Sequence, residues 1–185
     1  MACDFAPPLQ VTEWLNTPEP ITLASLRGKV VLLEAFQMLC PGCVSHSLPQ
    51  AQKARQLFKA DDLAVIGLHT VFEHFEAQGT RAAIEAFLHE YRITFPVGID
   101  AREEGQRLPQ TMQEYHMQGT PTTILIDHAG TIRKQKFGRE DDMLIGAEIM
   151  ALIAERSSTL SSRDTTVVSK HEGRCDSDGC QVQAR

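Results

Sequence analysis

Two cysteines, Cys40 and Cys43, stand two residues apart in the segment LCPGC, directly after an apolar run. A pair at this spacing is a reactive dithiol, half of a metal site or part of a tight turn. The thiolate is the form of cysteine that attacks disulfides, and the unpaired N–H groups at the start of a helix stabilise an anion. Pro41 suits such a start, since its missing N–H costs nothing there. We therefore favour a redox dithiol, in which Cys40 attacks a substrate disulfide and Cys43 resolves the mixed disulfide.

The histidines and the remaining cysteines give the metal interpretation little support. No second Cys-x-x-Cys and no pair of histidines has the spacing of zinc ligands. His69 and His74 flank the segment TVFE, and we expect both in a solvated loop. Cys3 is interpreted as an incidental thiol. We therefore predict no metal ion at the dithiol.

Glu34 is the only charged residue in the run VVLLEAF and precedes Cys40 by six positions. If this run is a central strand, the carboxyl group is buried, and burial raises the pKa of a carboxyl toward neutrality. A carboxyl of that kind relays protons near neutral pH, so we expect Glu34 to take the proton from Cys43 as that thiol attacks. A glutamate at a strand edge, with its carboxylate in solvent, remains the alternative.

Thr120 and Pro121 immediately precede the apolar segment TTILID. A proline at the start of a buried strand is unusual, because it donates no hydrogen bond to a neighbouring strand. A cis peptide bond between the two residues would make a tight bend there. It would also leave the Thr120 backbone free to pair with an extended substrate.

The apolar patterns place these residues on an alternation of strands and helices. Residues 30–36 and 63–69 are predicted as buried strands, and 43–59 and the segment after Thr80 as helices, with Thr80 as N-cap. A strand at 95–99, a short helix at 111–116 and strands at 122–127 and 131–137 follow. The last helix is predicted at 141–155, facing inward through Leu144, Ala147, Ala151 and Ala154. The order favours a mainly parallel sheet, covered on both faces, with an antiparallel closing pair.

The composition indicates one globular domain, 1–155, followed by a polar tail, 156–185. The net charge of -6 disfavours nucleic acid as a partner, because phosphate contact needs a basic face. No apolar run reaches the roughly 18 residues that cross a bilayer, so no membrane partner is expected. The N-terminal segment MACDFAPPLQ lacks a basic region followed by an apolar one. We therefore expect a cytoplasmic protein.

The tail carries a second pair, Cys175 and Cys180, separated by DSDG. One interpretation is a second redox pair, which exchanges electrons with the first dithiol or forms a regulatory disulfide. Another is a metal clip that adds His171 and an aspartate of the DSDG segment. The third is a tail with no role beyond solubility, and all three remain open.

The chain as a whole resembles the thioredoxin superfamily, and within it the TlpA-like thiol-disulfide oxidoreductases of the redoxin (AhpC/TSA-related) group. The resemblance extends from about residue 5 to residue 155, through ITLASLRGKVVLLEAF before CPGC, then LAVIGLH, FPVGID and GTPTTILIDHAGTIR. It implies an α/β thioredoxin-like fold, with a central mixed sheet flanked by helices and a helix-strand insertion at 71–100. It also implies that Pro121 is cis and faces the dithiol, that Cys40 is the exposed nucleophile and Cys43 the resolving thiol, and that Glu34 is the buried acid.

The resemblance implies exchange with dithiol or disulfide proteins, or with an electron-donor protein, and no cofactor is needed for that exchange. Leu39 and Gln37 stand where many relatives have tryptophan, the spacer is Pro-Gly instead of Gly-Pro, and Pro49 lies one residue later than usual. These departures leave the partner open. The Pro-x-x-x-Thr-x-x-Cys loop of peroxiredoxins is absent from the sequence. A thiol peroxidase and a metal-handling protein that uses the same cysteines remain the alternatives.

Overall fold

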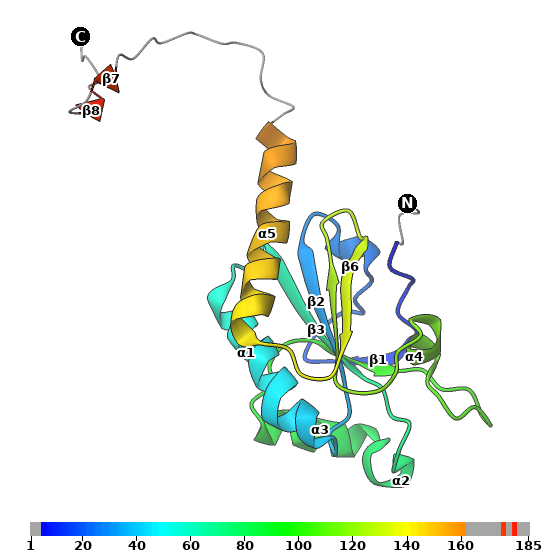
Figure 1. Cartoon of the computed structure of the whole chain (residues 1–185). Helices are drawn as coiled ribbons and strands as arrows, with labels where there is room; N and C mark the ends of the chain where they lie inside the picture. Colours follow the sequence, from blue (N-terminus) through cyan, green and yellow to red (C-terminus); the bar gives the residue numbers. More distant parts are fainter. Residues whose placement is uncertain (1–4, 162–174, 177–178, 181–185) are drawn as a thin grey trace.

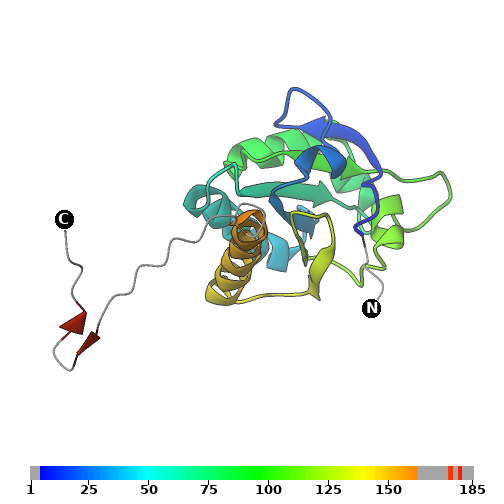
Figure 2. The ribbon, with the colours of Figure 1, turned by 90° about the horizontal axis from the view of Figure 1, so that it is seen from above.

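A six-stranded sheet with helices on both faces forms the body of the protein (Figure 1; Figure 2). The computed structural model describes residues 5–161, 175–176 and 179–180. For residues 157–161, 175–176 and 179–180 it describes only the backbone. The strand order is β1 (Val11–Leu15), β4 (Val97–Asp100), β3 (Leu63–His69), β2 (Val30–Phe36), β5 (Thr122–Ile126) and β6 (Ile132–Phe137). The predicted central mixed sheet flanked by helices is confirmed.

The strand directions correct the expectation of a mainly parallel sheet. β2, β3 and β4 are parallel, whereas β1, β5 and β6 each run antiparallel to a neighbour. The alternation of strands and helices did not reveal this, because the segment before β5 also carries a short helix, yet it brings the chain to β5 at the same end of the sheet where β2 and β4 end. β1 was not predicted at all, since the five residues VTEWL are mostly half-buried and show no clear alternation.

Each face of the sheet has its own helical layer and its own apolar core. One face is covered by η2 (Cys43–Ser47), α1 (Leu48–Leu57), α3 (Arg81–Glu90) and α5 (Asp142–Ser161). The other face is covered by the N-terminal segment, η1 (Ala24–Leu26) and α4 (Gln110–Glu114). All seven residues of β2 are buried, as expected for a strand at the centre of such a sandwich. No helix in the described part of the chain is both long and apolar enough to cross a membrane.

The inner face of α5 differs from the prediction. Ile145, Ile149 and Leu152 are buried, whereas the expected inward residues Leu144, Ala147, Ala151 and Ala154 are exposed. The reason is apolar area: three large side chains at helical spacing remove more surface from water than three alanines and one leucine. The helix also continues past residue 155 to Ser161.

The helix after the dithiol begins in an unusual way. The predicted helix 43–59 is π-helical over Cys43–Ser47 and α-helical over Leu48–Leu57. Pro49 has no N–H to donate to the carbonyl four residues earlier, and the wider turn lies where that bond is missing. Farther along, Thr80 caps α3 as predicted, because its hydroxyl oxygen accepts from the Ala83 N–H at 3.3 Å.

Candidate functional site

The two cysteines of the CPGC segment lie at the carboxyl end of β2 and differ in exposure. Both are free thiols; Cys40 is half-buried and Cys43 is fully buried. The backbone N–H of Cys43 donates to the Cys40 sulfur at 3.3 Å, and the Cys40 thiol faces the Thr120 carbonyl oxygen at 3.5 Å. An N–H directed at sulfur stabilises negative charge there. Because Cys40 is partly exposed and Cys43 is fully buried, a substrate disulfide can reach Cys40 but not Cys43.

The peptide bond between Thr120 and Pro121 is cis, as the resemblance implied. Because β5 runs antiparallel to β2, its first residues lie beside the last residues of β2 and so beside the dithiol. Gly42 is needed for this approach: a Cβ atom there would lie 3.3 Å from the Pro121 Cδ. The structure thus brings together the dithiol and the two residues predicted to orient a substrate.

Glu34 is fully buried on β2, which excludes the alternative of a carboxylate in solvent. One carboxyl oxygen accepts from the Thr123 hydroxyl at 2.9 Å, and the other has no hydrogen-bond partner among the described residues. Burial raises the pKa of Glu34 to about 8, and the Thr123 hydrogen bond opposes this only in part. The side chain is on the face of β2 that the Cys43 helix covers, since Leu32 and Phe36 on that face share a core cluster with Cys43.

Cys43 is not an activated thiol, because its pKa is raised instead of lowered. Burial raises the pKa of its thiol far above the usual range, and the hydrogen bond to Cys40 raises it further. This thiol therefore needs a proton acceptor before it can attack. Glu34, with a pKa near 8, is ionised in a minority of molecules at pH 7, and in that form it can accept the proton.

A groove of about 320 Å³ opens beside Cys40. One wall consists of Leu39, Cys40 and Pro41, and a second wall, called the opposite wall below, comes from the segment after β3. Its other lining residues are Gln37, Phe72, Glu73, His74, Gln78, Gln118, Gly119, Thr120 and Phe137. Sequence reasoning did not find the opposite wall, because no pattern in the sequence relates residues 72–78 to the dithiol.

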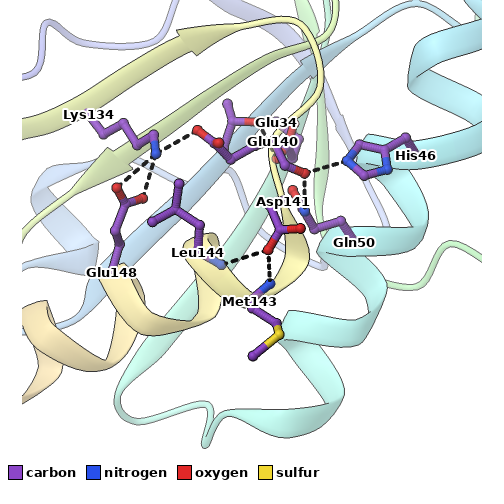
Figure 3. Close-up of polar contacts among 10 residues, drawn as sticks. Glu34, His46, Gln50, Lys134, Glu140, Asp141, Met143, Leu144 and Glu148 are labelled. Carbon is purple, nitrogen blue, oxygen red and sulfur yellow. Dashed lines mark hydrogen bonds and ion pairs between the residues drawn. The ribbon is translucent and has the colours of Figure 1, made fainter.

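A polar cluster joins the helix that follows the dithiol to β6 and α5 (Figure 3). The Glu140 carbonyl oxygen lies 2.6 Å from His46 Nε2 and accepts from the Gln50 amide at 3.0 Å. The Glu140 carboxylate pairs with Lys134 at 2.6 Å, and Lys134 also pairs with Glu148 at 2.7 Å. These contacts fix the helix over the sheet. His46 thus contacts the β6–α5 connection.

The structure tests the expectations for the histidines and the tail cysteines only in part. His74 is exposed, but His69 ends β3 with 1% exposure, so its expected place in a solvated loop was wrong. Among the described residues, no group of three or more His, Cys, Asp or Glu is arranged to hold a metal ion. Cys175 and Cys180 are paired in register in the short antiparallel ladder of β7 (Cys175–Asp176) and β8 (Gly179–Cys180). Cys3 and His171 lie outside the described residues.

Comparison with known proteins gives matches over most of the chain. The structure is similar to that of a thioredoxin-like superfamily protein, with a TM-score of 0.78 and 55% sequence identity over 81% of this chain and 96% of the other. It is also similar to a thiol-disulfide isomerase from Corynebacterium glutamicum, with a TM-score of 0.77 and 47% identity over 80% of this chain and 97% of the other. Protein DipZ of Mycobacterium bovis is 37% identical over 143 residues.

The DipZ match covers 76% of this chain but only 19% of DipZ, so the chain spans about a fifth of that relative's length. The predicted thioredoxin-like fold is confirmed by the solved structures. A family model described as AhpC/TSA matches residues 2–135. The chain therefore belongs to the AhpC/TSA family.

Proposed function

We propose that the chain is a thiol-disulfide oxidoreductase that exchanges disulfides with protein or small-thiol substrates through Cys40 and Cys43. The observation that carries the proposal is the unequal pair of thiols beside the cis bond at Pro121: one thiol is accessible and the other fully buried. The thiol-disulfide isomerase from Corynebacterium glutamicum, at 47% identity, supports the same activity.

The exchange proceeds in two steps. The Cys40 thiolate attacks one sulfur of the substrate disulfide, that S–S bond breaks, and the departing sulfur leaves as a thiolate that takes up a proton. Cys43 then loses its proton to Glu34 and attacks the Cys40 sulfur. The mixed disulfide breaks, the second substrate thiol is released, and the two electrons of the dithiol have moved to the substrate. An external dithiol protein restores the reduced pair.

The geometry also supports a substrate-orienting role for Thr120 and Pro121. The Thr120 carbonyl oxygen faces the Cys40 sulfur, and its backbone precedes the first residue of β5. An extended substrate placed along Thr120 would pair with this backbone as an added strand does. Its disulfide would then lie next to Cys40.

Insulin reduction by the wild type and by two variants tests this function. The wild type is expected to turn over, whereas Cys40→Ser is inactive and Cys43→Ser accumulates a mixed disulfide visible by mass spectrometry. No turnover by the wild type, together with stoichiometric bound metal, would falsify the hypothesis of an enzyme and favour a metal-handling protein. Rapid consumption of hydroperoxide without insulin reduction would favour a thiol peroxidase.

The tail pair and the location of the protein stay predictions. Two cysteines opposite each other in antiparallel strands have Cα atoms about 4.5 to 5.5 Å apart, a separation that a disulfide spans. A Cys175→Ser/Cys180→Ser variant with unchanged turnover and unchanged metal content would exclude both the second redox pair and the metal clip. Cell fractionation tests the cytoplasmic location.

A further inference from the structure

Two buried carboxamide side chains lie beside the dithiol and have no part in the exchange steps above. Gln37 follows β2 and is 3% exposed, and Gln78 ends α2 (Phe75–Gln78) and is 1% exposed. The Gln78 amide donates to the Gln37 side-chain oxygen at 3.2 Å, although 41 residues separate them in the chain. Their contact joins the end of β2 to the segment inserted after β3.

Gln37 connects that inserted segment to the residue before Pro121. Its side-chain oxygen accepts from the backbone N–H groups of Phe72 at 3.1 Å and Glu73 at 3.2 Å. Its amide nitrogen donates to the Thr120 hydroxyl oxygen at 3.3 Å. One side chain therefore holds two of the segments that line the groove.

Gln78 connects the same segment to the residue before Cys40. Its side-chain oxygen accepts from the Leu39 backbone N–H at 3.2 Å, and its amide nitrogen also donates to the Glu73 carbonyl oxygen at 2.7 Å. With Gln37, it links the dithiol loop, the inserted segment and the start of β5.

The inserted segment has little support of its own. α2 is four residues long, no side chain caps it, and His74 before it has a left-handed backbone with φ of 50°. A satisfied polar network in a buried setting selects one arrangement, and removing a member leaves its partners unsatisfied at a cost of about 1 to 3 kcal/mol each. The two carboxamides therefore determine where the groove's opposite wall stands.

We propose that Gln37 and Gln78 are positioning residues that hold the segment 71–78 as the substrate-binding wall opposite Cys40. The substrate class that depends on them is a polypeptide disulfide, because residues flanking its cysteine would extend along the groove that Phe72 and Glu73 line. A small disulfide contacts Cys40 alone and does not need the wall. This inference rests on the proposed oxidoreductase function.

The test compares two substrates, insulin and bis(2-hydroxyethyl) disulfide, on wild type and on Gln78→Met. Methionine retains the length of the side chain and loses all three hydrogen bonds. The KM for insulin is expected to rise about tenfold, equivalent to about 1.4 kcal/mol of binding. The KM for the small disulfide is expected to rise by a smaller factor, about twofold. Gln37→Met and the double variant should give the same shift, because the two side chains act as one unit.

Gln52→Met is the matched control. Gln52 also bridges two backbone carbonyl oxygens, those of Tyr91 at 3.1 Å and Arg92 at 2.9 Å, but it is not in the groove. It should leave both substrates unaffected. If Gln78→Met is poorly folded, Gln78→Asn, whose shorter side chain cannot span the same contacts, should show the same selective rise in KM.

Equal losses on both substrates, or no loss on either, would overturn the inference while leaving the oxidoreductase function intact. Absence of turnover by the wild type on both substrates would instead remove the proposed function itself. The two failures are therefore distinguished within one set of measurements.

Discussion

The buried carboxyl group of Glu34 makes the stability of the reduced protein depend on pH, and one substitution should remove that dependence. Burial raises its pKa from 4.5 to about 8, whereas the unfolded chain exposes the group to water. Between these two values the folded state keeps a proton that the unfolded state gives up. The stabilisation is fully present below pH 4.5 and is lost as the pH rises toward 8.

The size of the effect follows from the pKa shift. Each pH unit in this window lowers the free energy of unfolding by about 1.4 kcal/mol, so the loss at pH 7 is about 3 kcal/mol. His69 acts in the opposite sense, because burial lowers its pKa to about 4 from an ordinary value of 6.5. The stability that neutral His69 contributes is lost as the pH falls from 6.5 to about 4. The two slopes offset each other between about pH 4.5 and 6.5, and the wild type should lose stability mainly above pH 6.5.

Glu34→Gln removes the titrating carboxyl but keeps an oxygen that accepts from the Thr123 hydroxyl. We expect the variant to match the wild type near pH 4.5 and to exceed its stability by about 3 kcal/mol at pH 7. Urea unfolding of the reduced proteins from pH 4.5 to 8.5 measures this difference. Glu104→Gln, at an exposed glutamate, is the control and should show no such trend. A stability difference between Glu34→Gln and wild type that stays constant with pH would refute the reasoning.

Two further predictions concern packing and charge. Gly42→Ala places a Cβ 3.3 Å from the Pro121 Cδ and should lower insulin turnover several-fold and stability by about 1 kcal/mol. Gly146→Ala, whose Cβ meets no atom within 4 Å in α5, should instead add about 0.5 to 1 kcal/mol without changing turnover; equal effects of the two variants would contradict this. Lys134→Met removes the ion pair that lowers the pKa of Glu140, and should cost about 1 to 2 kcal/mol at pH 7. That cost should shrink as the pH falls below the ordinary glutamate pKa, and urea unfolding at pH 7 and pH 3 would show whether it does.

The parts of the site that could be predicted depend on local sequence. A single charged residue in an apolar run predicted the burial of Glu34, and a proline before a strand pointed to the bend at Pro121. The direction of β5 could not be predicted, because the connection from β4 to β5 also contains a helix, and the order strand–helix–strand alone does not distinguish it from a crossover between parallel strands.

Long-range contacts explain the other omissions. Gln78 contacts Gln37 across 41 residues, and nothing in the four-residue helix that carries it indicates burial. The face of α5 was misjudged for a related reason: alanines and isoleucines both repeat at helical spacing there, and only the packing against the sheet selects Ile145 and Ile149.

The ends of the domain lie far from the groove, at the end of the sheet where β2 begins. Phe5 pairs with Thr131 near the end of β5, and Arg156 on α5 donates to the carbonyl oxygens of Gly28 and Asp61. Figure 1 shows both ends of the domain at the end of the sheet opposite α2. A partner protein joined to either end would leave the mouth of the groove open. A linker at either end would therefore leave Cys40 exposed at the groove, and the length of the linker would set the distance over which Cys40 can reach a disulfide.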